Sequence, residues 1–318
     1  MQDKLKEFKF PRPAGARAEF HWDGRRFIGA EGEQADILSY SEAQSNWSED
    51  LTNLHEQEAG QNHPIDRASR ALAIRSLKFF VNFPAPTVLE IGCSSGFLLE
   101  ELIYQFPEAG IIGADYIKPM LERLAKRLPE VPILQFDLRS CPLPDESVHA
   151  VVCLNVLEHI DDDTAAMRHI ARILKPGGIA HIEVPSGPHL YDVYDELLMH
   201  HRRYRMAGLV RLARSAGLEV VRKTHLGFFV FPAFAATKLA NRWRRRSPTM
   251  QKKDMVVSRI RKTSGSSVFR FVMSLENRLG LRVQFPFGIR CVLVARKPPR
   301  LTEKFQQSAN SIQQSDHG

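Results

Sequence analysis

Hydrophobic positions change their spacing along the chain. Before about residue 62 the sequence is polar and mixed, and its apolar residues follow no strong period. From residue 65 to 80 apolar residues recur at helical spacing, which predicts a helix with Asp66 as the cap at its start. Residues 82–86 then end that helix, because prolines and polar residues interrupt the pattern.

Beyond residue 86, short apolar runs alternate with amphipathic runs. The short runs predict strands at 87–92, 110–115, 132–137, 148–155, 179–185, 218–226 and 289–297. The amphipathic runs predict helices at 97–106, 118–128, 161–174, 206–217 and 268–279. Nearly continuous apolar strands between helices are typical of parallel strands buried on both faces. The pattern therefore predicts an α/β fold with a doubly wound sheet.

The domain organisation follows from these elements. We expect residues 1–80 to form an N-terminal extension with a cap helix, and residues 81–298 to form the main domain. Two stretches inside it, 186–206 and 227–288, interrupt the regular alternation. We expect these insertions and the N-terminal extension to form a helical cap over a substrate. Residues 299–318 are rich in Gln and Ser, which predicts a disordered tail.

The positive charge of the chain is local. The chain has a net charge of +8, but ten Lys and Arg and a single acid, Asp254, fall between Lys238 and Lys262. The remainder is almost neutral. This 238–262 basic patch keeps a nucleic-acid-binding protein or an RNA methyltransferase open as an alternative. No recognised RNA-binding module accompanies the patch, so nucleic acid is the less favoured partner.

Hydropathy and cysteine usage indicate the compartment. No apolar run approaches the roughly 18 to 20 residues that span a bilayer, and the first residues lack the apolar stretch of a signal peptide. We therefore expect a cytoplasmic protein. The four cysteines have no metal-ligand spacing, so we expect small buried apolar residues at Cys93, Cys141, Cys153 and Cys291.

Polar residues and glycines stand where the predicted strands end. A turn from Gly92 to Gly96 leads from a strand into a helix, so its backbone can approach a ligand closely. Asp115 ends the next strand, where a carboxylate can accept both hydroxyls of a ribose. Asp137 ends the third strand, and Asn155 follows the fourth. Because these ends meet at one edge of a parallel sheet, we expect a nucleoside to bind there.

Residues from about 87 to 178 resemble the core of class I S-adenosylmethionine-dependent methyltransferases, especially the small-molecule branch that includes quinone-biosynthesis methyltransferases. Five motifs carry the resemblance: Glu90-x-Gly92-x-x-x-Gly96, GAD at 113–115, FDL at 136–138, LNVLEHI at 154–160 and RILKPGG at 172–178. The resemblance implies a Rossmann-like, seven-stranded sheet whose last strand is antiparallel. It also implies S-adenosylmethionine as the methyl donor.

The resemblance further implies a donor site at the strand ends. Glu90 and the two glycines belong to the methionyl end, Asp115 to the ribose, and Asp137 with the Leu138 amide to the adenine. The full expected set is Glu90, Gly92, Cys93, Gly96, Asp115, Tyr116, Asp137, Leu138 and Asn155. One residue departs from the family pattern, because Ser94 stands where a glycine is frequent. A serine can be accommodated at this position if its backbone torsions are ordinary, so the donor site is still expected.

The acceptor is less well defined by the sequence. Relatives that methylate planar amines typically carry Asn/Asp-Pro-Pro-aromatic after the fourth strand, and those with a cysteine nucleophile carry Pro-Cys, whereas residues 155–158 read Asn-Val-Leu-Glu. Residues 191–205 and 285–298 resemble a bacterial subgroup that modifies sugars, glycolipids and other secondary products. Methyl transfer to an oxygen of a small-molecule, glycan or lipid-linked acceptor is therefore favoured, and an inactive donor-binding regulator remains an alternative.

Three histidines are candidates for catalysis. His159 could remove a proton from a hydroxyl acceptor, or it could brace the next helix, whose acidic start would stabilise a histidinium. His200 and His201 could touch the acceptor, or they could belong to a solvated basic face. The acidic run at 161–163 and Asp192 are explained by helix starts, so we expect no metal.

Two further features concern the insertions. Arg202 or Arg203 could clamp a phosphate or carboxylate of the acceptor, or pair with nearby acids. An apolar, aromatic stretch at 226–236 precedes the basic patch, a combination that an interfacial helix requires. We consider peripheral association with an anionic membrane through 226–262, at the inner membrane face. The alternative is that these phenylalanines pack onto the core.

Overall fold

Eight strands form one sheet in the computed structural model, which describes residues 4–13, 15–16, 19–41, 61–243, 266–280 and 282–300. The strand order is β10-β11-β9-β8-β5-β6-β7-β4. The strands are β4 (Ile37–Ser39), β5 (Thr87–Ile91), β6 (Gly110–Asp115), β7 (Ile133–Gln135), β8 (Val148–Leu154), β9 (Leu174–Pro185), β10 (Glu219–Leu226) and β11 (Arg290–Arg296). The last strand, β11, runs antiparallel to both of its neighbours, as the family resemblance implied.

The expected number of seven strands is corrected to eight. Strand β4, from the N-terminal extension, pairs in parallel with β7, so that Ile37 lies opposite Ile133. The Tyr40 N–H continues this pairing, donating a 2.8 Å hydrogen bond to the Gln135 carbonyl. This addition covers the backbone groups of β7, which would otherwise be the edge of the sheet.

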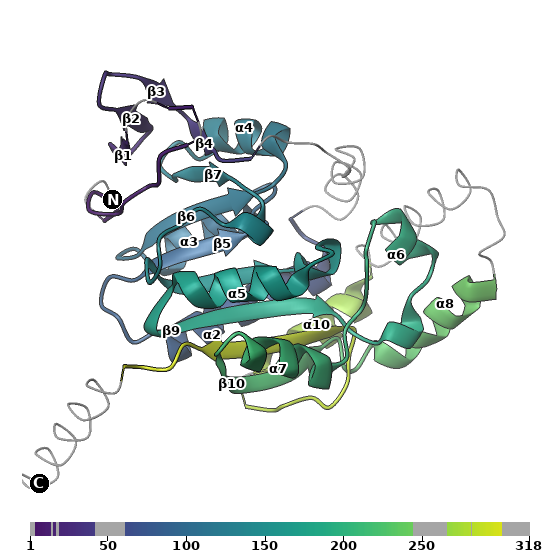
Figure 1. Cartoon of the computed structure of the whole chain (residues 1–318). Coiled ribbons are helices and arrows are strands. Elements are labelled where there is room, and N and C mark those ends of the chain that lie inside the picture. Colours follow the sequence, from purple (N-terminus) through teal and green to yellow (C-terminus); the bar gives the residue numbers. More distant parts are fainter. Residues whose placement is uncertain are drawn as a thin grey trace, which may run out of the picture.

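Helices cover both faces of the sheet (Figure 1). One face carries α5 (Asp163–Ile173) and α7 (Met206–Ser215), whose apolar residues share a core with β8, β9 and β11. The opposite face carries α2 (Pro64–Phe80), α3 (Phe97–Gln105) and α4 (Lys118–Arg127), with α10 (Ser267–Leu279) packed against α2. The doubly wound architecture is therefore as predicted.

The described residues of the N-terminal extension before α2 form no helix. They form a small antiparallel sheet of β1 (Phe20–Trp22), β2 (Phe27–Gly29) and β3 (Gln34–Ala35). Phe10, Trp22 and Phe27 are buried in one core with Leu89 and Leu134 of the large sheet. These strands are only two or three residues long, too short for their alternation to be recognised in the sequence.

Helix α2 lies on the sheet, and the predicted cap at its start is wrong. Its N-cap residue is His63, whose side chain makes no capping hydrogen bond, and Pro64 begins the helix. Asp66 lies within the first turn and pairs instead with Arg290 of β11, at 2.6 Å. By contrast, the acidic start of α5 is as expected, because the Asp162 carboxylate accepts a hydrogen bond from the Ala165 N–H.

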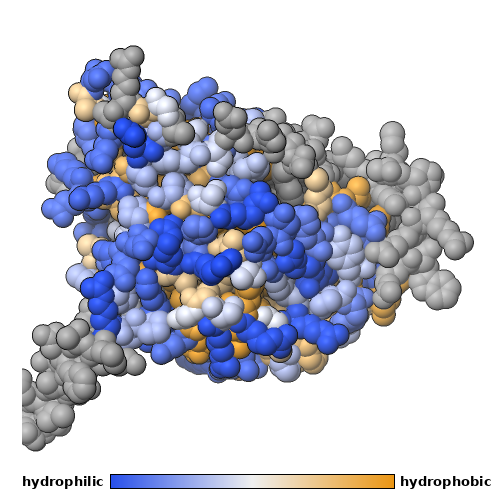
Figure 2. Space-filling view, in the orientation of Figure 1, coloured by the Kyte–Doolittle hydropathy of each residue, from blue (hydrophilic) through white to orange (hydrophobic). Residues whose placement is uncertain are grey.

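One helix of each insertion lies beyond the carboxyl ends of the strands, where Figure 1 shows α6 (Val193–Leu197) and α8 (Phe231–Trp243). Residues 244–265, with most of the predicted basic patch, and residues 301–318 of the predicted tail lie outside the described residues. The face in Figure 2 is largely hydrophilic, with apolar side chains beside the grey segment on the right. None of the described helices has the length and apolarity needed to cross a bilayer.

Candidate active site

The turn after β5 requires glycine at both ends. Gly92 has φ 79°, and a Cβ built on it would lie 2.3 Å from Cγ2 of Val156. Gly96 has φ 70°, and a Cβ there would lie 2.4 Å from Cδ1 of Leu124. Side chains are therefore excluded on both conformational and steric grounds. The result is an open strip of backbone at the start of α3, next to the segment that follows β8.

The condition of ordinary backbone torsions at Ser94 is not met. Ser94 has φ 44°, in the left-handed region that favours glycine, which is the residue that the family pattern often has here. A non-glycine residue in that region costs about 1 to 3 kcal/mol unless its surroundings hold it there. The turn therefore keeps the glycine conformation although its residue has changed.

Asp115 lies at the carboxyl end of β6 and is held by backbone donors. Its carboxylate accepts hydrogen bonds from the N–H groups of Ser94 (3.0 Å), Tyr116 (2.6 Å) and Ile117 (3.1 Å). These contacts come from both the β5 turn and the turn after β6. The carboxylate is thus oriented at the edge of the sheet where the nucleoside was predicted to bind.

Glu90 is a buried carboxylate beside the same turn. It is 6% exposed, and its Oε2 atom makes no hydrogen bond with the described residues. Burial, followed by the negative charge of Asp115, raises the pKa of Glu90 well above its usual range, while Arg70 acts in the opposite direction. A cationic ligand placed here would remove this cost, because it would pair with the charged form.

Two residues of the predicted donor set have other partners. The Cys93 side chain is 3% exposed within the core, and its N–H donates to the Ala114 carbonyl. The contact of Cys93 with the donor stays a prediction, in which neither its buried thiol nor its N–H is exposed to a ligand as the structure stands. Asn155 has φ 54°, and its side-chain amide donates a long, 3.4 Å hydrogen bond to the Glu183 carboxylate. Asn155 thus lies at the end of β8, fixed to the neighbouring strand.

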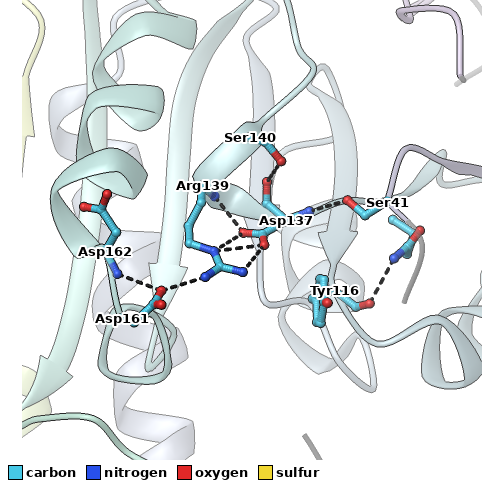
Figure 3. Close-up of polar contacts among 8 residues, drawn as sticks. Ser41, Tyr116, Asp137, Arg139, Ser140, Asp161 and Asp162 are labelled. Carbon is cyan, nitrogen blue, oxygen red and sulfur yellow. Dashed lines mark hydrogen bonds and ion pairs between the residues drawn. The ribbon is translucent and has the colours of Figure 1, made fainter. Parts of the chain in front are cut away.

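Asp137 caps η1 (Leu138–Ser140) at the end of β7 (Figure 3). Its carboxylate accepts from the Arg139 N–H at 2.8 Å and pairs with the Arg139 guanidinium at 2.6 Å. Arg139 also pairs with Asp161 at 2.7 Å. The Leu138 side chain is buried, and the Asp137 N–H donates to the Ser41 hydroxyl at 3.0 Å. An adenine amine would share the Asp137 carboxylate with Arg139.

The predicted catalytic residues divide into two groups. His159, in η2 (Leu157–His159), packs edge-on against His200, with ring centroids 4.6 Å apart. Glu158 joins them, because ligand atoms of these three residues lie within 4.8 Å of one another. His201 is exposed, and only its N–H is tied to the site, donating to the Glu158 carbonyl at 2.7 Å. We refer to Glu158, His159 and His200 as the Glu-His-His cluster.

The cluster does not hold a histidinium. Burial, then the neighbouring His200 and His201, lowers the pKa of His159 to about 2. The acidic run does not stabilise a charge on it as the alternative required, since Asp161 pairs with Arg139 and Asp163 pairs with Arg202 at 2.8 Å. His159 is therefore neutral at physiological pH and is a weak base.

A buried ion network supports His200. Its Nδ1 lies 2.9 Å from the Asp195 carboxylate, which also contacts Lys238 at 2.9 Å and Arg203 at 3.6 Å. Lys238 is 4% exposed and makes a second contact with Asp192, at 2.6 Å. Lys238 was counted in the basic patch, but it joins α8 to α6 instead. Sequence periodicity could have indicated this, because Phe234 lies one turn earlier on the same face of α8.

The fold and this edge of the sheet define a class I S-adenosylmethionine-dependent methyltransferase domain. The ends of β5 and β6 bring together a glycine turn, a buried Glu90 without a described partner for its Oε2 and an Asp115 held by three amides. Residues 89–182 match the family model described as a methyltransferase domain. The residues at this edge fit S-adenosylmethionine, because Glu90 is a buried carboxylate whose Oε2 makes no hydrogen bond with the described residues and can pair with a cationic ligand.

Relatives and solved structures agree with this family. The chain is 34% identical over 135 residues to a protein of Mycolicibacterium smegmatis named for S-adenosylmethionine-dependent methyl transfer, covering 42% of this chain and 52% of that protein. It is 30% identical over 137 residues to trans-aconitate 2-methyltransferase of Azoarcus sp., covering 43% and 51%. The chain thus spans about half the length of these relatives.

Among solved structures, one similar fold is that of phosphoethanolamine N-methyltransferase 2 of Haemonchus contortus in complex with S-adenosyl-L-methionine. The TM-score is 0.51 at 18% identity, over 80% of this chain and 58% of that one. At this identity the likeness establishes the fold alone.

Proposed function

We propose that this protein transfers a methyl group from S-adenosylmethionine to an oxygen of a small-molecule, glycan or lipid-linked acceptor. The observation that carries the proposal is Glu90, a buried carboxylate at the end of β5 with no described partner for its Oε2. S-adenosylmethionine supplies a methyl group on a sulfonium, which is already activated for displacement. The protein therefore mainly has to align donor and acceptor and exclude water.

The donor residues follow the order of the strands. The Glu90 carboxylate accepts a hydrogen bond from the ammonium group of the donor's methionyl part. The Gly92–Gly96 backbone lies along the methionyl part. The Asp115 carboxylate accepts hydrogen bonds from the ribose hydroxyls, because a carboxylate oxygen can accept more than one hydrogen bond. The Asp137 carboxylate accepts a hydrogen bond from the adenine amine, and the Leu138 N–H donates one to the adenine ring. Tyr116 lies beside the adenine. Asn155, at the carboxyl end of β8, borders the donor site on the side of that strand.

The acceptor oxygen is placed at the Glu-His-His cluster. Val156 joins the two halves of the site, because it contacts Gly92 on one side and precedes η2 on the other. Residues 155–158 lack the prolines and aromatic ring that hold planar amines in relatives, which supports oxygen over nitrogen. The name of the Azoarcus relative supports a small-molecule acceptor.

His159 and His200 act on the acceptor by contact and positioning more than by uptake of its proton. The low pKa of His159 makes it a weak proton acceptor at neutral pH. Its neutral ring can still accept or donate one hydrogen bond, and so can that of His200. We expect changes at either residue to lower turnover more than donor affinity.

Two measurements test the function. Isothermal titration calorimetry should detect S-adenosylmethionine and its demethylated product binding at one site, and a wild-type protein that binds neither would overturn the proposal. Incubation with radiolabelled donor and fractionated cell extract should then place the label in a lipid, glycan or small-molecule fraction. Donor binding without label transfer to any fraction would favour the inactive regulator, and label in RNA would favour the RNA methyltransferase.

The nucleic-acid alternative has lost part of its basis. Lys238, the first residue of the basic patch, is buried and paired with Asp192 and Asp195.

Membrane association, in contrast, is supported by exposed apolar residues on the described insertion. Phe229 is 46% exposed and Leu239 of α8 is 47% exposed, whereas Phe228 stacks on Phe285 with ring centroids 4.9 Å apart. The phenylalanines therefore divide between the core and the surface.

A further inference from the structure

We propose that Glu158, His159 and His200 form a binding site for one divalent transition-metal cation at the carboxyl end of β8. The site lies on η2 and on the loop between α6 and α7, which β8 and the 186–206 insertion bring together. It was not expected from the sequence, because Glu158 and His159 are separated from His200 by 41 residues or more.

The geometry of the three side chains suits a single ion. One ligand atom from each residue lies within 4.8 Å of the other two. A four-coordinate cation with bonds of about 2.1 Å holds its ligands roughly 3.4 Å apart, so modest side-chain rotation closes the site. The backbone already fixes the approach, because the His201 N–H donates to the Glu158 carbonyl at 2.7 Å.

Glu158 is the observation that points to a ligand. It is 1% exposed, and neither of its carboxylate oxygens makes a hydrogen bond with the described residues. A buried carboxylate with no hydrogen bond is costly, because its charge loses hydration without gaining a partner. A bound cation supplies the missing charge and coordination.

The residues around His200 resemble the support of metal-binding histidines. Its Nδ1 lies 2.9 Å from Asp195, and the other ring nitrogen is thereby the one suited to a cation. Asp195 is itself fixed by Lys238 at 2.9 Å and by the backbone N–H of Asp192 at 3.0 Å. This carboxylate–histidine arrangement fixes the ring before a cation binds.

The ligand set selects the class of cation. Two imidazoles and one carboxylate suit Zn²⁺, Co²⁺, Mn²⁺ or Fe²⁺, whereas Mg²⁺ and Ca²⁺ prefer all-oxygen sites. Three protein ligands leave positions open for an exogenous oxygen. The role in catalysis rests on the proposed function: a cation here would bind the acceptor hydroxyl and lower its pKa.

The test is a titration of tag-free, full-length protein, first stripped of metal with a chelator. Adding Co²⁺ should produce visible absorption bands that saturate at one ion per chain, and Zn²⁺ should displace the Co²⁺ and abolish the bands. Glu158→Gln and His200→Gln should each weaken Co²⁺ binding roughly 100-fold or more, and Asp195→Asn about 10- to 100-fold. His201→Gln is the matched control, because it changes the adjacent, exposed histidine, and it should bind as the wild type does.

The proposal would be overturned if the wild type formed no one-to-one complex with Co²⁺. It would also be overturned if His201→Gln weakened Co²⁺ binding as much as Glu158→Gln and His200→Gln do. If the cluster variants do not fold, the Co²⁺ form of the wild type still decides the question. Its proton NMR spectrum should show strongly shifted N–H signals from two histidine rings, and a spectrum without them would contradict the assignment. Donor calorimetry on the metal-free protein separates this proposal from the proposed function, because donor binding should persist without the cation.

Discussion

The N–H of Ser94 donates a 3.0 Å hydrogen bond to the Asp115 carboxylate, while Ser94 itself has φ 44°. The two residues lie on different turns, after β5 and after β6. The hydrogen bond therefore joins the turn expected to hold the methionyl part of the donor to the carboxylate expected to hold the ribose. It also offsets part of the conformational cost of a left-handed serine.

The first prediction is that Ser94→Gly stabilises the protein. Glycine occupies this region without a Cβ penalty, so the free energy of unfolding should rise by about 1 kcal/mol. Urea denaturation followed by circular dichroism measures the change. Ser95→Gly is the control, because Ser95 does not have positive φ, and it should lower stability by about 0.5 to 1 kcal/mol. A loss of stability in Ser94→Gly would show that the serine side chain outweighs the strain.

The second prediction ranks the two acidic donor residues. Asp115→Asn should weaken S-adenosylmethionine binding by about 2 to 3 kcal/mol, because charge-assisted hydrogen bonds to two hydroxyls are lost. Asp137→Asn should cost less, since it meets a single amine and already shares its carboxylate with Arg139. Calorimetry measures both, with Asp161→Asn as a control that removes only the far partner of Arg139. The reverse order would contradict the assignment of ribose and adenine.

Much of the fold could be predicted because the parallel sheet repeats one pattern. Strands β6, β7 and β8 each end at or next to a polar residue, so the strand pattern alone was enough to predict Asp115, Asp137 and Asn155 at one edge. The start of α5 was equally predictable, because Asp162 caps it with a local hydrogen bond to Ala165. Local signals of this kind depend on residues near one another in the sequence.

What could not be predicted depends on contacts between distant segments. Strand β4 has three residues and exists because β7 offers it an edge. Lys238 looks like one more base in a basic run, and only its contact with Asp192, 46 residues away, explains its burial. The Glu-His-His cluster likewise requires the loop before α7 to return to η2. In each case the residue can be recognised in the sequence, but its partner lies far away along the chain and cannot be identified without the structure.

The third prediction concerns pH. His181, in the centre of β9, is fully buried, and burial lowers its pKa to about 3. The unfolded chain takes up a proton near pH 6.5 while the folded protein does not, so stability falls as the pH falls below 6.5. Between pH 7 and pH 5 this histidine should account for a loss of about 2 kcal/mol. His181→Leu should remove that part of the loss.

Urea denaturation at pH 7 and pH 5 measures the difference between His181→Leu and the wild type. His21→Gln is the control, because His21 is exposed, and it should lose as much stability as the wild type does. If His181→Leu and the wild type show the same loss between the two pH values, then His181 does not titrate as its burial requires.

The fourth prediction is that Lys238→Met detaches α8 from α6. It leaves Asp192 and Asp195 without their shared cation, and breaking a buried pair in this way costs about 3 kcal/mol or more. Limited proteolysis should cut within 231–243 faster than in the wild type. Lys223→Met is the control, because Lys223 is exposed on β10, and it should change stability by less than about 0.5 kcal/mol.

The fifth prediction is that the 227–288 insertion binds anionic membranes through an exposed apolar face of α10. Val268, Phe271 and Leu275 are 74%, 69% and 44% exposed and lie on one side of this helix. Glu276, on the buried side, accepts from the N–H groups of Gly227 and Phe229, which places the exposed Phe229 next to α10.

The basic patch completes this argument, although most of it lies outside the described residues. Each base near an anionic surface is worth about 1 kcal/mol, so three arginines at 244–246 should matter as much as the apolar face. In liposome co-sedimentation the wild type should bind vesicles that contain anionic lipid, and added salt should weaken binding. Phe271→Glu, and separately glutamate at Arg244, Arg245 and Arg246, should each reduce it sharply. Tyr104→Glu on α3 is the control for losing an exposed aromatic ring, since Tyr104 is 82% exposed on another surface. If the wild type stays in the supernatant at low salt, the exposed face of α10 has some other partner and the arginines are simply solvated.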